Sequence, residues 1–514
     1  MSQQLEALPP GWGIASLGEV CDVNVRGFLP ASASGSMRVV FVPMAAVSEE
    51  FGGIDIAATR PLQEVVKGYT SFVEGDVLFA KITPCMENGK LAVVPPLPSL
   101  VGFGSTEFHV LRSGESVVPR WLAYYLSQRE FRRAARQDMS GSAGQLRVQT
   151  GWLSAARIPL APVNEQRRIV DAVEVLLSEL DAGVRELQAA QKKLAQYRQS
   201  LLKGAVEGAL TAEWRARNPP QETGAELLAR ILRERRARWE RRQLNGFKAQ
   251  GKVPPTDWRA KYVEPAVPTS ATESAAATTW AWASIGQCFQ VAVGATPSRK
   301  EPSYWGGTVP WVSSGEVRFE RIAATRECIS EAGLNNSSTR MNPVGSVLLG
   351  MIGEGKTRGQ VAILGIPATN NQNCAAIWVS ETDIPPEFVY YWLWSRYDET
   401  RRGSSGNNQP ALNKTLVEAM PLPVPPVSEA REIVSRVDAQ LAGIAAQERE
   451  IEQLLRMATA QRQNILRAAF SGQLVPQDPN DEPAGALLAR IAQARSSQQA
   501  LPKQRRARSA KEPA

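Results

Sequence analysis

The sequence predicts two mixed α/β (α+β) domains in tandem repeat, each followed by a long helix, in a chain of 514 residues. The first observation is an internal repeat, in which residues 163–170 (VNEQRRIV) recur as residues 427–434 (VSEAREIV). The match continues without a gap through Leu210 and Leu474. Solenoid repeats have periods of about 20–50 residues, so this larger repeat indicates two related halves.

Residues 1–160 predict a mixed domain because short β-rich runs alternate with Gly, Pro and Asn turns. The runs lie at residues 39–42, 75–79 and 91–94. A helix is expected to follow Pro119, from Arg120 to about Ala135. Its aromatic residues fall mostly on one helical face, which favours a role in the core over base stacking: Trp121, Tyr124, Tyr125 and Phe131.

The second half repeats this order of elements but differs in content between the shared segments. One scaffold with two different contents is the pattern expected of a fold that reads two different sequences. The matching segments are residues 12–18 with 280–286, 119–126 with 386–393, and 141–144 with 403–406.

Heptads of apolar residues follow each mixed block and predict a coiled coil. The second series has a partly polar companion seam, and polar seam residues can fix register and orientation at some cost in stability. The predicted coiled-coil residues are Val173, Leu180, Leu187, Leu194 and Leu201 in the first helix, and Val437, Ile444, Ile451 and Ile465 in the second.

These patterns divide the chain into six segments. They are residues 1–160 and 278–424 (the two mixed domains), 161–210 and 425–475 (the central and distal spacer helices), 211–277 (a basic helical linker) and 476–514 (a basic tail).

The net charge of +8 is carried by the linker and the tail. Residues 211–262 hold 13 basic and 6 acidic side chains, and residues 490–514 hold 7 and 1. The large blocks are therefore not basic domains. The linker and tail either contact phosphates or dock on acidic partner surfaces, and a solvated helix face is the plain alternative.

Five scattered cysteines without a CxxC pair predict free thiols in a reducing cytoplasm. The only histidine, His109, lies in an alternating strand-like run and is expected to be structural. The sequence predicts no metal site. It has no signal peptide and no run of 18 apolar residues, so we expect no membrane contact.

Residues 350–357 (GMIGEGKT) match the phosphate-loop pattern, which leaves nucleotide binding as an alternative function. A working phosphate loop must open a helix, whereas residues 361–364 (VAIL) predict a strand. We therefore favour a hairpin loop that carries Lys356, Thr357 and Arg358. The counterpart in the first half carries Lys81, Asn88 and Lys90. Residues 218–221 (NPPQ) match a methyltransferase motif only partly, by chance.

Several segments together resemble the specificity subunits of type I restriction-modification systems. Residues 294–299 (GATPSR), 304–312 and 350–364 are similar to one class of target-recognition domain. Residues 41–55 and 74–90, with the later segment GFGSTEFHVLR, are similar to another class. The spacer segments also resemble those of the family, although residues 472–475 lack the Thr-Ala-Glu-Trp continuation that follows Leu210 in the first copy.

The resemblance implies a non-catalytic subunit in the cytoplasm of a bacterium or archaeon. Each recognition domain would read one half of a bipartite site in double-stranded DNA, and the antiparallel coiled coil would set the gap. Two methyltransferase (M) subunits would bind S-adenosylmethionine, and restriction (R) subunits would use ATP and Mg. A coiled-coil scaffold without DNA contact is a further alternative. The candidate DNA-binding residues are Lys81, Asn88, Lys90, Gln145, Arg147, Ser298, Arg299, Lys356, Thr357, Arg358, Gln360, Asn407, Asn408 and Gln409.

Overall fold

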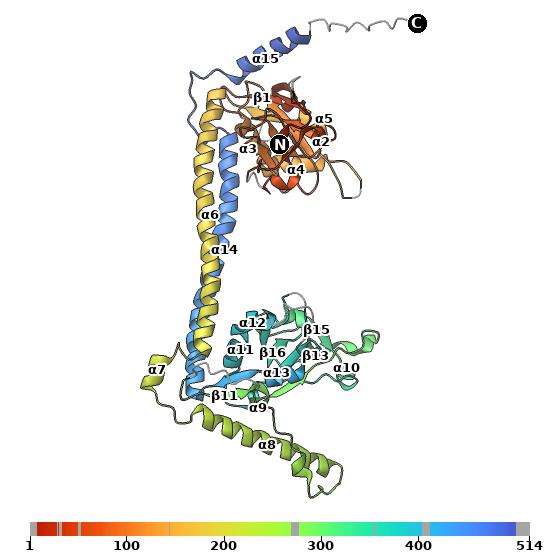
Figure 1. Ribbon diagram of the computed structural model, residues 1–514, viewed down its shortest axis with the longest axis vertical. Coiled ribbons are helices and arrows are strands. Elements are labelled where there is room, and N and C mark those ends of the chain that lie inside the picture. Colours follow the sequence, from red (N-terminus) through yellow and green to blue (C-terminus); the bar gives the residue numbers. More distant parts are fainter. Residues whose placement is uncertain are drawn as a thin grey trace. The chain divides into compact units, whose positions relative to one another are not determined.

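The computed structural model describes residues 8–27, 29, 33–49, 53–142, 144–268, 277–353, 356–402 and 412–499. The chain folds into two compact units. The first unit comprises residues 1–188 and 452–514, and the second comprises residues 189–451. Two helices of 44 residues each, α6 (Val163–Val206) and α14 (Val427–Phe470), contribute to both units and confirm the two predicted long helices (Figure 1).

The mixed domain of the first unit contains two four-stranded sheets. One is antiparallel, in the order β2-β9-β6-β7, and the other has the order β4-β3-β8-β5, with β3 parallel to β8. Apolar residues of these sheets fill the core, which agrees with the predicted strands. The strands are β1 (Gly13–Ser16), β2 (Cys21–Val23), β3 (Arg38–Val42), β4 (Thr59–Pro61), β5 (Thr70–Phe72), β6 (Val77–Ala80), β7 (Leu91–Val93), β8 (Gly102–Gly104), β9 (Phe108–Ser113) and β10 (Arg157–Leu160).

The helix expected at 120–135 is two helices, because Gln128 adopts an extended backbone conformation between them. The prediction of one continuous helix was wrong, but the core role of its aromatics is confirmed: Trp121 is 0% exposed and Phe131 is 2% exposed. The helices of this domain are α1 (Leu17–Val20), η2 (Met44–Ala46), α2 (Leu62–Val65), α3 (Pro119–Ser127), α4 (Arg129–Gln137) and α5 (Thr150–Ala155).

The mixed domain of the second unit has a five-stranded sheet in the order β12-β19-β16-β17-β14 and a three-stranded sheet in the order β15-β13-β18. Its helix α11 carries the same buried aromatic face as α3. The strands are β11 (Ala281–Ser284), β12 (Gln290–Val293), β13 (Trp305–Val312), β14 (Arg321–Ile322), β15 (Glu327–Ile329), β16 (Val347–Gly350), β17 (Val361–Leu364), β18 (Thr369–Asn370), β19 (Cys374–Trp378) and β20 (Pro421–Val424). The helices are α9 (Ile285–Cys288), η5 (Pro302–Tyr304), η6 (Ser314–Glu316), α10 (Glu331–Asn335), η7 (Val379–Glu381), α11 (Pro386–Ser395), α12 (Tyr397–Arg402) and α13 (Lys414–Ala419).

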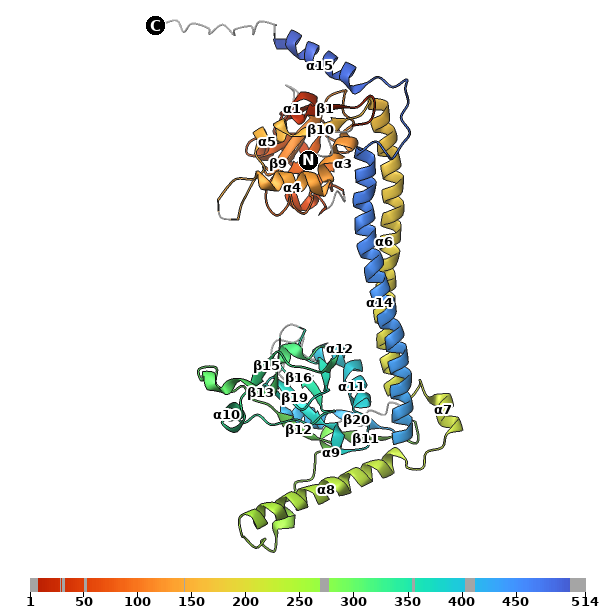
Figure 2. The same ribbon diagram turned by 180° about the vertical axis from the view of Figure 1, so that it is seen from behind.

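Each domain is closed by a short antiparallel strand pair at its base. In the first unit β1 pairs with β10, with Gly13 opposite Leu160. In the second unit β11 pairs with β20, with Ala281 opposite Val424. β10 and β20 directly precede α6 and α14, so each domain begins and ends at the start of a long helix (Figure 2).

A buried glutamate at the start of each long helix faces a tryptophan at the base of the domain. In the second unit the indole Nε1 of Trp280 donates to Glu429, which is 1% exposed and also accepts from Thr211 and Arg215. In the first unit the equivalent Glu165 is also 1% exposed. Burial raises the pKa of Glu165, and the nearby Trp12 indole opposes that shift.

The two long helices run antiparallel within each unit. In the first unit Asp181 of α6 pairs with Arg462 of α14, while Arg168, earlier in α6, pairs with Asp481 beyond the end of α14. In the second unit Arg198 pairs with Glu448 at 2.5 Å, and Arg436 donates to the carbonyl of Leu210. In these pairs the residue numbers in the α14 region decrease as those in the α6 region increase. This order confirms the predicted antiparallel pairing.

The predicted heptad residues differ in burial along these helices. Six are buried: Val173, Leu201, Val437, Ile444, Ile451 and Ile465. Leu180, Leu187 and Leu194, which lie toward the middle of α6, are half-buried.

Further helices dock on the base of each domain in matching ways. The Gly224 amide of α8 (Gly224–Ala249) donates to Thr279 at 2.8 Å, and the Ala484 amide of α15 (Ala484–Gln499) donates to Gly11 at 2.8 Å. Gly224 is required there, because a Cβ would overlap the carbonyl oxygen of Val424. The remaining helices of the linker are α7 (Ala212–Arg217) and η4 (Trp258–Lys261).

No helix among the described residues is long and apolar enough to cross a membrane. The five cysteines are free thiols, as predicted. Burial raises the pKa of Cys288 and of Cys374 to about 12, so both are protonated at neutral pH.

Candidate nucleic-acid interface

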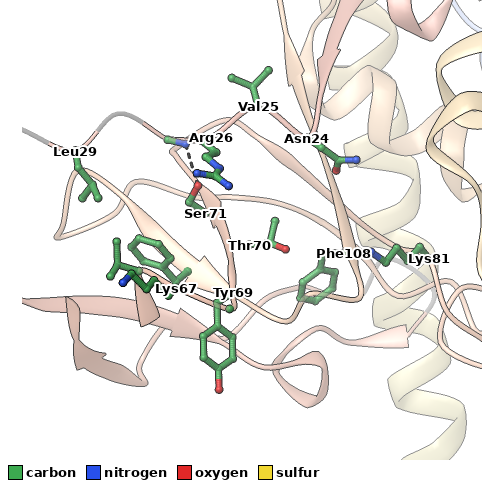
Figure 3. A pocket seen from close by; sticks show the side chains of 14 residues that line it. Asn24, Val25, Arg26, Leu29, Lys67, Tyr69, Thr70, Ser71, Lys81 and Phe108 are labelled. Atoms are coloured by element: carbon green, nitrogen blue, oxygen red, sulfur yellow. Dashed lines mark hydrogen bonds between the residues drawn. The ribbon is translucent and has the colours of Figure 1, made fainter. Parts of the chain in front are cut away.

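A polar cavity of about 500 Å³ opens on the domain of the first unit, beside the end of β6 (Figure 3). β6 ends at Ala80 and delivers Lys81 to its wall, so one predicted DNA-binding residue lies there. Arg26 and Lys67 also line it and are exposed. Three cations with hydroxyl and amide groups between them suit contacts to phosphate oxygens and base edges.

Asn24 shapes one wall of this cavity. Its φ of 61° is unusual for a non-glycine residue, and its side chain holds that conformation by contacting His109 Nδ1 at 3.1 Å and accepting from the Val110 amide. His109 is 2% exposed and its Nε2 lies 2.8 Å from the Val148 carbonyl. Burial lowers the pKa of His109, so this histidine is a neutral, structural residue as predicted.

Arg147 and Gln145 lie on the segment that follows α4. Arg147 forms a two-pronged ion pair with Glu107, at 2.9 and 3.0 Å. That hydrogen bonding lowers the pKa of Glu107. Gln145 is exposed, and its carbonyl accepts from Arg147. The fixed guanidinium is an oriented donor, and its contact with DNA stays a prediction.

Asn88 and Lys90 are engaged with the protein itself. The Asn88 amide donates to Glu49 at 2.8 Å. The Lys90 ammonium donates to the carbonyls of Met44 and Val47 at 3.2 and 3.0 Å. These contacts fasten the segment after β3 to the loop after β6, so both residues have a structural role in this unit.

In the second unit Arg299 is held by two kinds of interaction. It forms a bidentate ion pair with Glu327 at 2.6 and 2.9 Å, and its guanidinium lies 3.6 Å from the ring centre of Trp305. The backbone carbonyl of the neighbouring Ser298 accepts a hydrogen bond from the Trp305 indole Nε1, and Ser298 is itself exposed. Arg299 is half-exposed, so one edge remains open to a ligand.

The loop after β16 is a hairpin and not a phosphate loop. β16 and β17 pair antiparallel, with Leu349 opposite Val361. The turn at residues 356–359 leads through Gln360 into β17, so no helix starts among the described residues of this loop. The predicted hairpin is confirmed, and nothing in this geometry supports nucleotide binding.

The side chains that this hairpin presents differ in exposure. Lys356 is exposed, and its carbonyl accepts from the Tyr397 hydroxyl at 2.8 Å. Thr357, Arg358 and Gln360 are half-buried. The remaining candidates Asn407, Asn408 and Gln409 lie outside the described residues.

Sequence reasoning missed Asn24, Arg26 and Lys67, which the fold brings to the cavity from the segment after β2 and the turn before β5. No spacing in the sequence relates these positions. It also missed the Trp280–Glu429 contact, although both residues lie in the repeated segments. The same tryptophan and glutamate occur at the matching positions Trp12 and Glu165 of the first half. This repetition could have predicted that the two residues contact each other.

Comparison with known proteins finds a domain model that matches part of the second half. Residues 278–456 match the model of the type I restriction modification DNA specificity domain. The specificity subunit of the EcoAI type I restriction enzyme of Escherichia coli is 34% identical over 175 residues, which are 34% of this chain and 29% of that subunit. The EcoEI specificity subunit of the same species is 30% identical over 270 residues, 44% of each chain. The matches thus span less than half the length of these relatives.

Solved structures share the fold over nearly the whole chain. A chain from a study of complex assembly and conformational transition of the type I R-M system aligns with a TM-score of 0.66 at 21% identity, covering 91% of this chain and 99% of its own length. The HsdS subunit of Thermoanaerobacter tengcongensis aligns with a TM-score of 0.53 at 20% identity, covering 92% and 100%. The predicted fold class is therefore confirmed. Together, the domain model and these relatives show that parts of the chain are similar to the specificity subunits of type I restriction-modification systems.

Proposed function

We propose that the chain is the DNA sequence-specificity subunit of a type I restriction-modification enzyme and has no active site of its own. Each mixed domain reads one half of a bipartite target in double-stranded DNA. The paired helices α6 and α14 set the gap between the half-sites. Two methyltransferase subunits dock on the helical region and bind S-adenosylmethionine, and restriction subunits supply the ATP- and Mg-dependent steps.

One observation carries this proposal: two copies of one frame bear different loops. Both frames consist of a closing strand pair, a buried aromatic helix and a long helix with a buried glutamate at its start. The loops on them differ, with the Arg26, Lys67 and Lys81 cavity on one and the Arg299 and Lys356 loops on the other. A shared scaffold with distinct cationic loops fits two independent readers.

Exchanging residues 278–424 for the equivalent domain of another specificity subunit tests the proposal. The complex with methyltransferase subunits should then methylate a motif changed in one half only, as adenine-modification sequencing of the host genome would reveal. The reciprocal exchange of residues 1–160 should change the other half. A change in both halves of the motif after one exchange would refute independent reading by the two domains. If the wild-type complex shows no sequence dependence, a scaffold without DNA contact would be favoured.

A further inference from the structure

The linker helix α8 and its return segment form a strongly basic arm. Between residues 232 and 262 the chain carries ten basic and three acidic side chains. The helix starts with a capping box, in which the Thr223 hydroxyl accepts from the Glu226 amide and Glu226 accepts from the Thr223 amide at 2.8 Å. Figures 1 and 2 show α8 running from the base of α14 along one side of the recognition domain.

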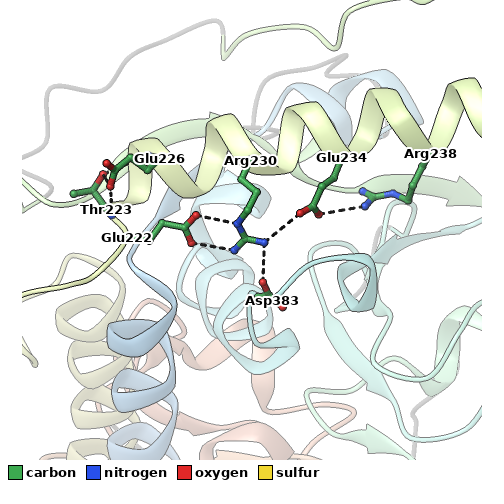
Figure 4. Close-up of polar contacts among 7 residues, drawn as sticks. All are labelled: Glu222, Thr223, Glu226, Arg230, Glu234, Arg238 and Asp383. Atoms are coloured by element: carbon green, nitrogen blue, oxygen red, sulfur yellow. Dashed lines mark hydrogen bonds and ion pairs between the residues drawn. The ribbon is translucent and has the colours of Figure 1, made fainter.

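The first half of α8 is fastened to the recognition domain of its own unit. Arg230 binds Glu222 through two bonds of 2.9 and 3.0 Å and also pairs with Asp383 at 2.9 Å (Figure 4). Arg235 donates to the carbonyl of Phe289 at 2.9 Å. Leu227 and Ile231 are buried against the same domain. The arm is therefore held at a fixed position relative to this reader.

The second half of α8 is stiffened by an aromatic cluster. Trp239 stacks on Trp258 with ring centres 5.8 Å apart, and Tyr262 meets Trp239 edge-on at 5.3 Å. Phe247 also meets Trp258 edge-on, with ring centres 6.4 Å apart, and Trp258 is 6% exposed. This cluster holds residues 250–262 against the helix. The basic side chains of this segment therefore lie on an ordered surface.

A cavity of about 230 Å³, lined mainly by cationic side chains, lies between the helix, the return segment and the domain, which contributes Gln290 and Glu381. Arg235, Arg238 and Arg242 line it from successive turns of α8, and Lys261 lines it from the return segment. Arg238 is already paired with Glu381 and Glu234 at 3.8 and 3.7 Å. Arg242 and Lys261 are exposed and have no hydrogen-bonded or ionic partner among the described residues.

We propose that one face of this arm, the face that carries Arg242 and Lys261, binds the phosphodiester backbone of duplex DNA beside the half-site that the second domain reads. The inference rests on the proposed function, because that function brings DNA to this unit. Guanidinium and ammonium groups match phosphate oxygens in charge and in hydrogen-bond geometry. Contacts of this kind position a protein on DNA without reading its sequence. An acidic protein surface is the competing occupant, and the experiment separates the two.

The test compares Arg242→Ala/Lys261→Ala with Arg233→Ala in the full-length chain assembled with its methyltransferase subunits. Arg233 is the matched control, because it is an exposed arginine on the same helix. Nine residues, or about two and a half turns, separate it from Arg242, so it points to the opposite face. Binding to a target duplex and to an unrelated duplex is measured over a range of salt concentrations.

We expect the double variant to bind both duplexes roughly threefold to tenfold more weakly and to lower the salt slope by about 2, since each phosphate contact contributes about 0.9. The methylated motif should not change, and Arg242→Lys should keep the slope. Trimming the duplex on the side of the second half-site should abolish the difference from wild type.

Two outcomes would overturn the inference. One is a double variant whose DNA binding and salt slope equal those of Arg233→Ala. The other is a variant that loses affinity for the methyltransferase subunits while its DNA salt slope is unchanged, which would identify an acidic protein partner. Failure of the proposed function looks different, because the wild-type complex would then bind target and unrelated duplexes equally.

Discussion

Arg215 forms an ion pair with Glu429 at 2.7 Å, and the carboxylate that it neutralises is 1% exposed while the guanidinium is 18% exposed. The Trp280 indole and the Thr211 hydroxyl also donate hydrogen bonds to the Glu429 carboxylate. The pair therefore joins the segment after α6, the start of α14 and the base of the second domain.

Arg215→Ala should destabilise the second unit by about 2–3 kcal/mol. Breaking a fully buried pair costs about 3–5 kcal/mol, and the partial exposure of Arg215 reduces that cost. Denaturant unfolding would measure the change. Arg217→Ala is the control, since Arg217 is 79% exposed and lies 3.9 Å from Glu213. It should change stability by less than about 0.5 kcal/mol, and equal effects would contradict the assigned role of Arg215.

Glu165→Gln should raise the thermal stability of the first unit at neutral pH. Burial raises the pKa of Glu165. Trp12 and Arg168 lower this pKa in part, whereas the negative charge of Asp481 raises it further. The unfolded chain then releases its proton at a lower pH than the folded chain. Stability is therefore lost as pH rises from the ordinary glutamate pKa of 4.5 through the raised pKa of the folded chain.

The glutamine variant should not lose this stability, so the difference in melting temperature between variant and wild type should widen as the pH rises above the ordinary glutamate pKa of 4.5. Glu429→Gln serves as the opposite case, because it leaves Arg215 without its ionic partner. It should lower stability at neutral pH. A Glu165→Gln protein that is less stable than wild type at neutral pH would show that the ionised carboxylate is favourable there.

Lys356→Ala should weaken target binding about threefold to tenfold, consistent with loss of a single charged contact. ATP hydrolysis by the complete enzyme should persist when bound DNA is saturating, because the described part of the hairpin between β16 and β17 contains no helix that could hold a nucleotide. Lys203→Ala, an exposed change on α6, is the control. Loss of ATPase at saturating DNA would revive the phosphate-loop alternative.

Lengthening both long helices should widen the gap in the target. Four residues inserted between residues 188 and 189 of α6 and between 451 and 452 of α14 fall at the boundary of the two units. Each helix would gain about 6 Å and turn by about 40°, close to two base pairs at roughly 3.4 Å each. Sequencing of methylated adenines should reveal unchanged half-sites and a longer gap. An active variant whose target keeps the original gap would disprove that α6 and α14 set the spacing between the half-sites.

The architecture could be predicted because it depends on local patterns that occur twice. Periodic apolar residues mark α6 and α14, and the run at 77–79 gives β6. The break at Gln128 could not be predicted, because the sequence from 119 to 137 has no proline or glycine after its start. With this bend, Trp121 of α3 and Phe131 of α4 both lie in one core cluster, which depends on tertiary packing and not on local sequence.

The candidate site was harder to predict because its parts come from distant segments. Lys81 was expected from the turn after β6. Asn24 and Lys67 share its cavity only because β2 and β5 lie nearby in the folded domain. Asn88 and Lys90 looked equally suitable by residue type, yet both are bonded to the segment from Met44 to Glu49. Residue type identifies donors, whereas only the fold shows which protein groups they already contact, and DNA contact by Asn88 and Lys90 stays a prediction.

The matching docking of α8 and α15 gives the chain a cyclic order. α8 follows the first domain and its long helix but is bonded to Thr279 of the second domain, and α15 follows the second but is bonded to Gly11 of the first. No domain in this order is intrinsically first. A circularly permuted gene that starts with the second domain would preserve every one of these local contacts.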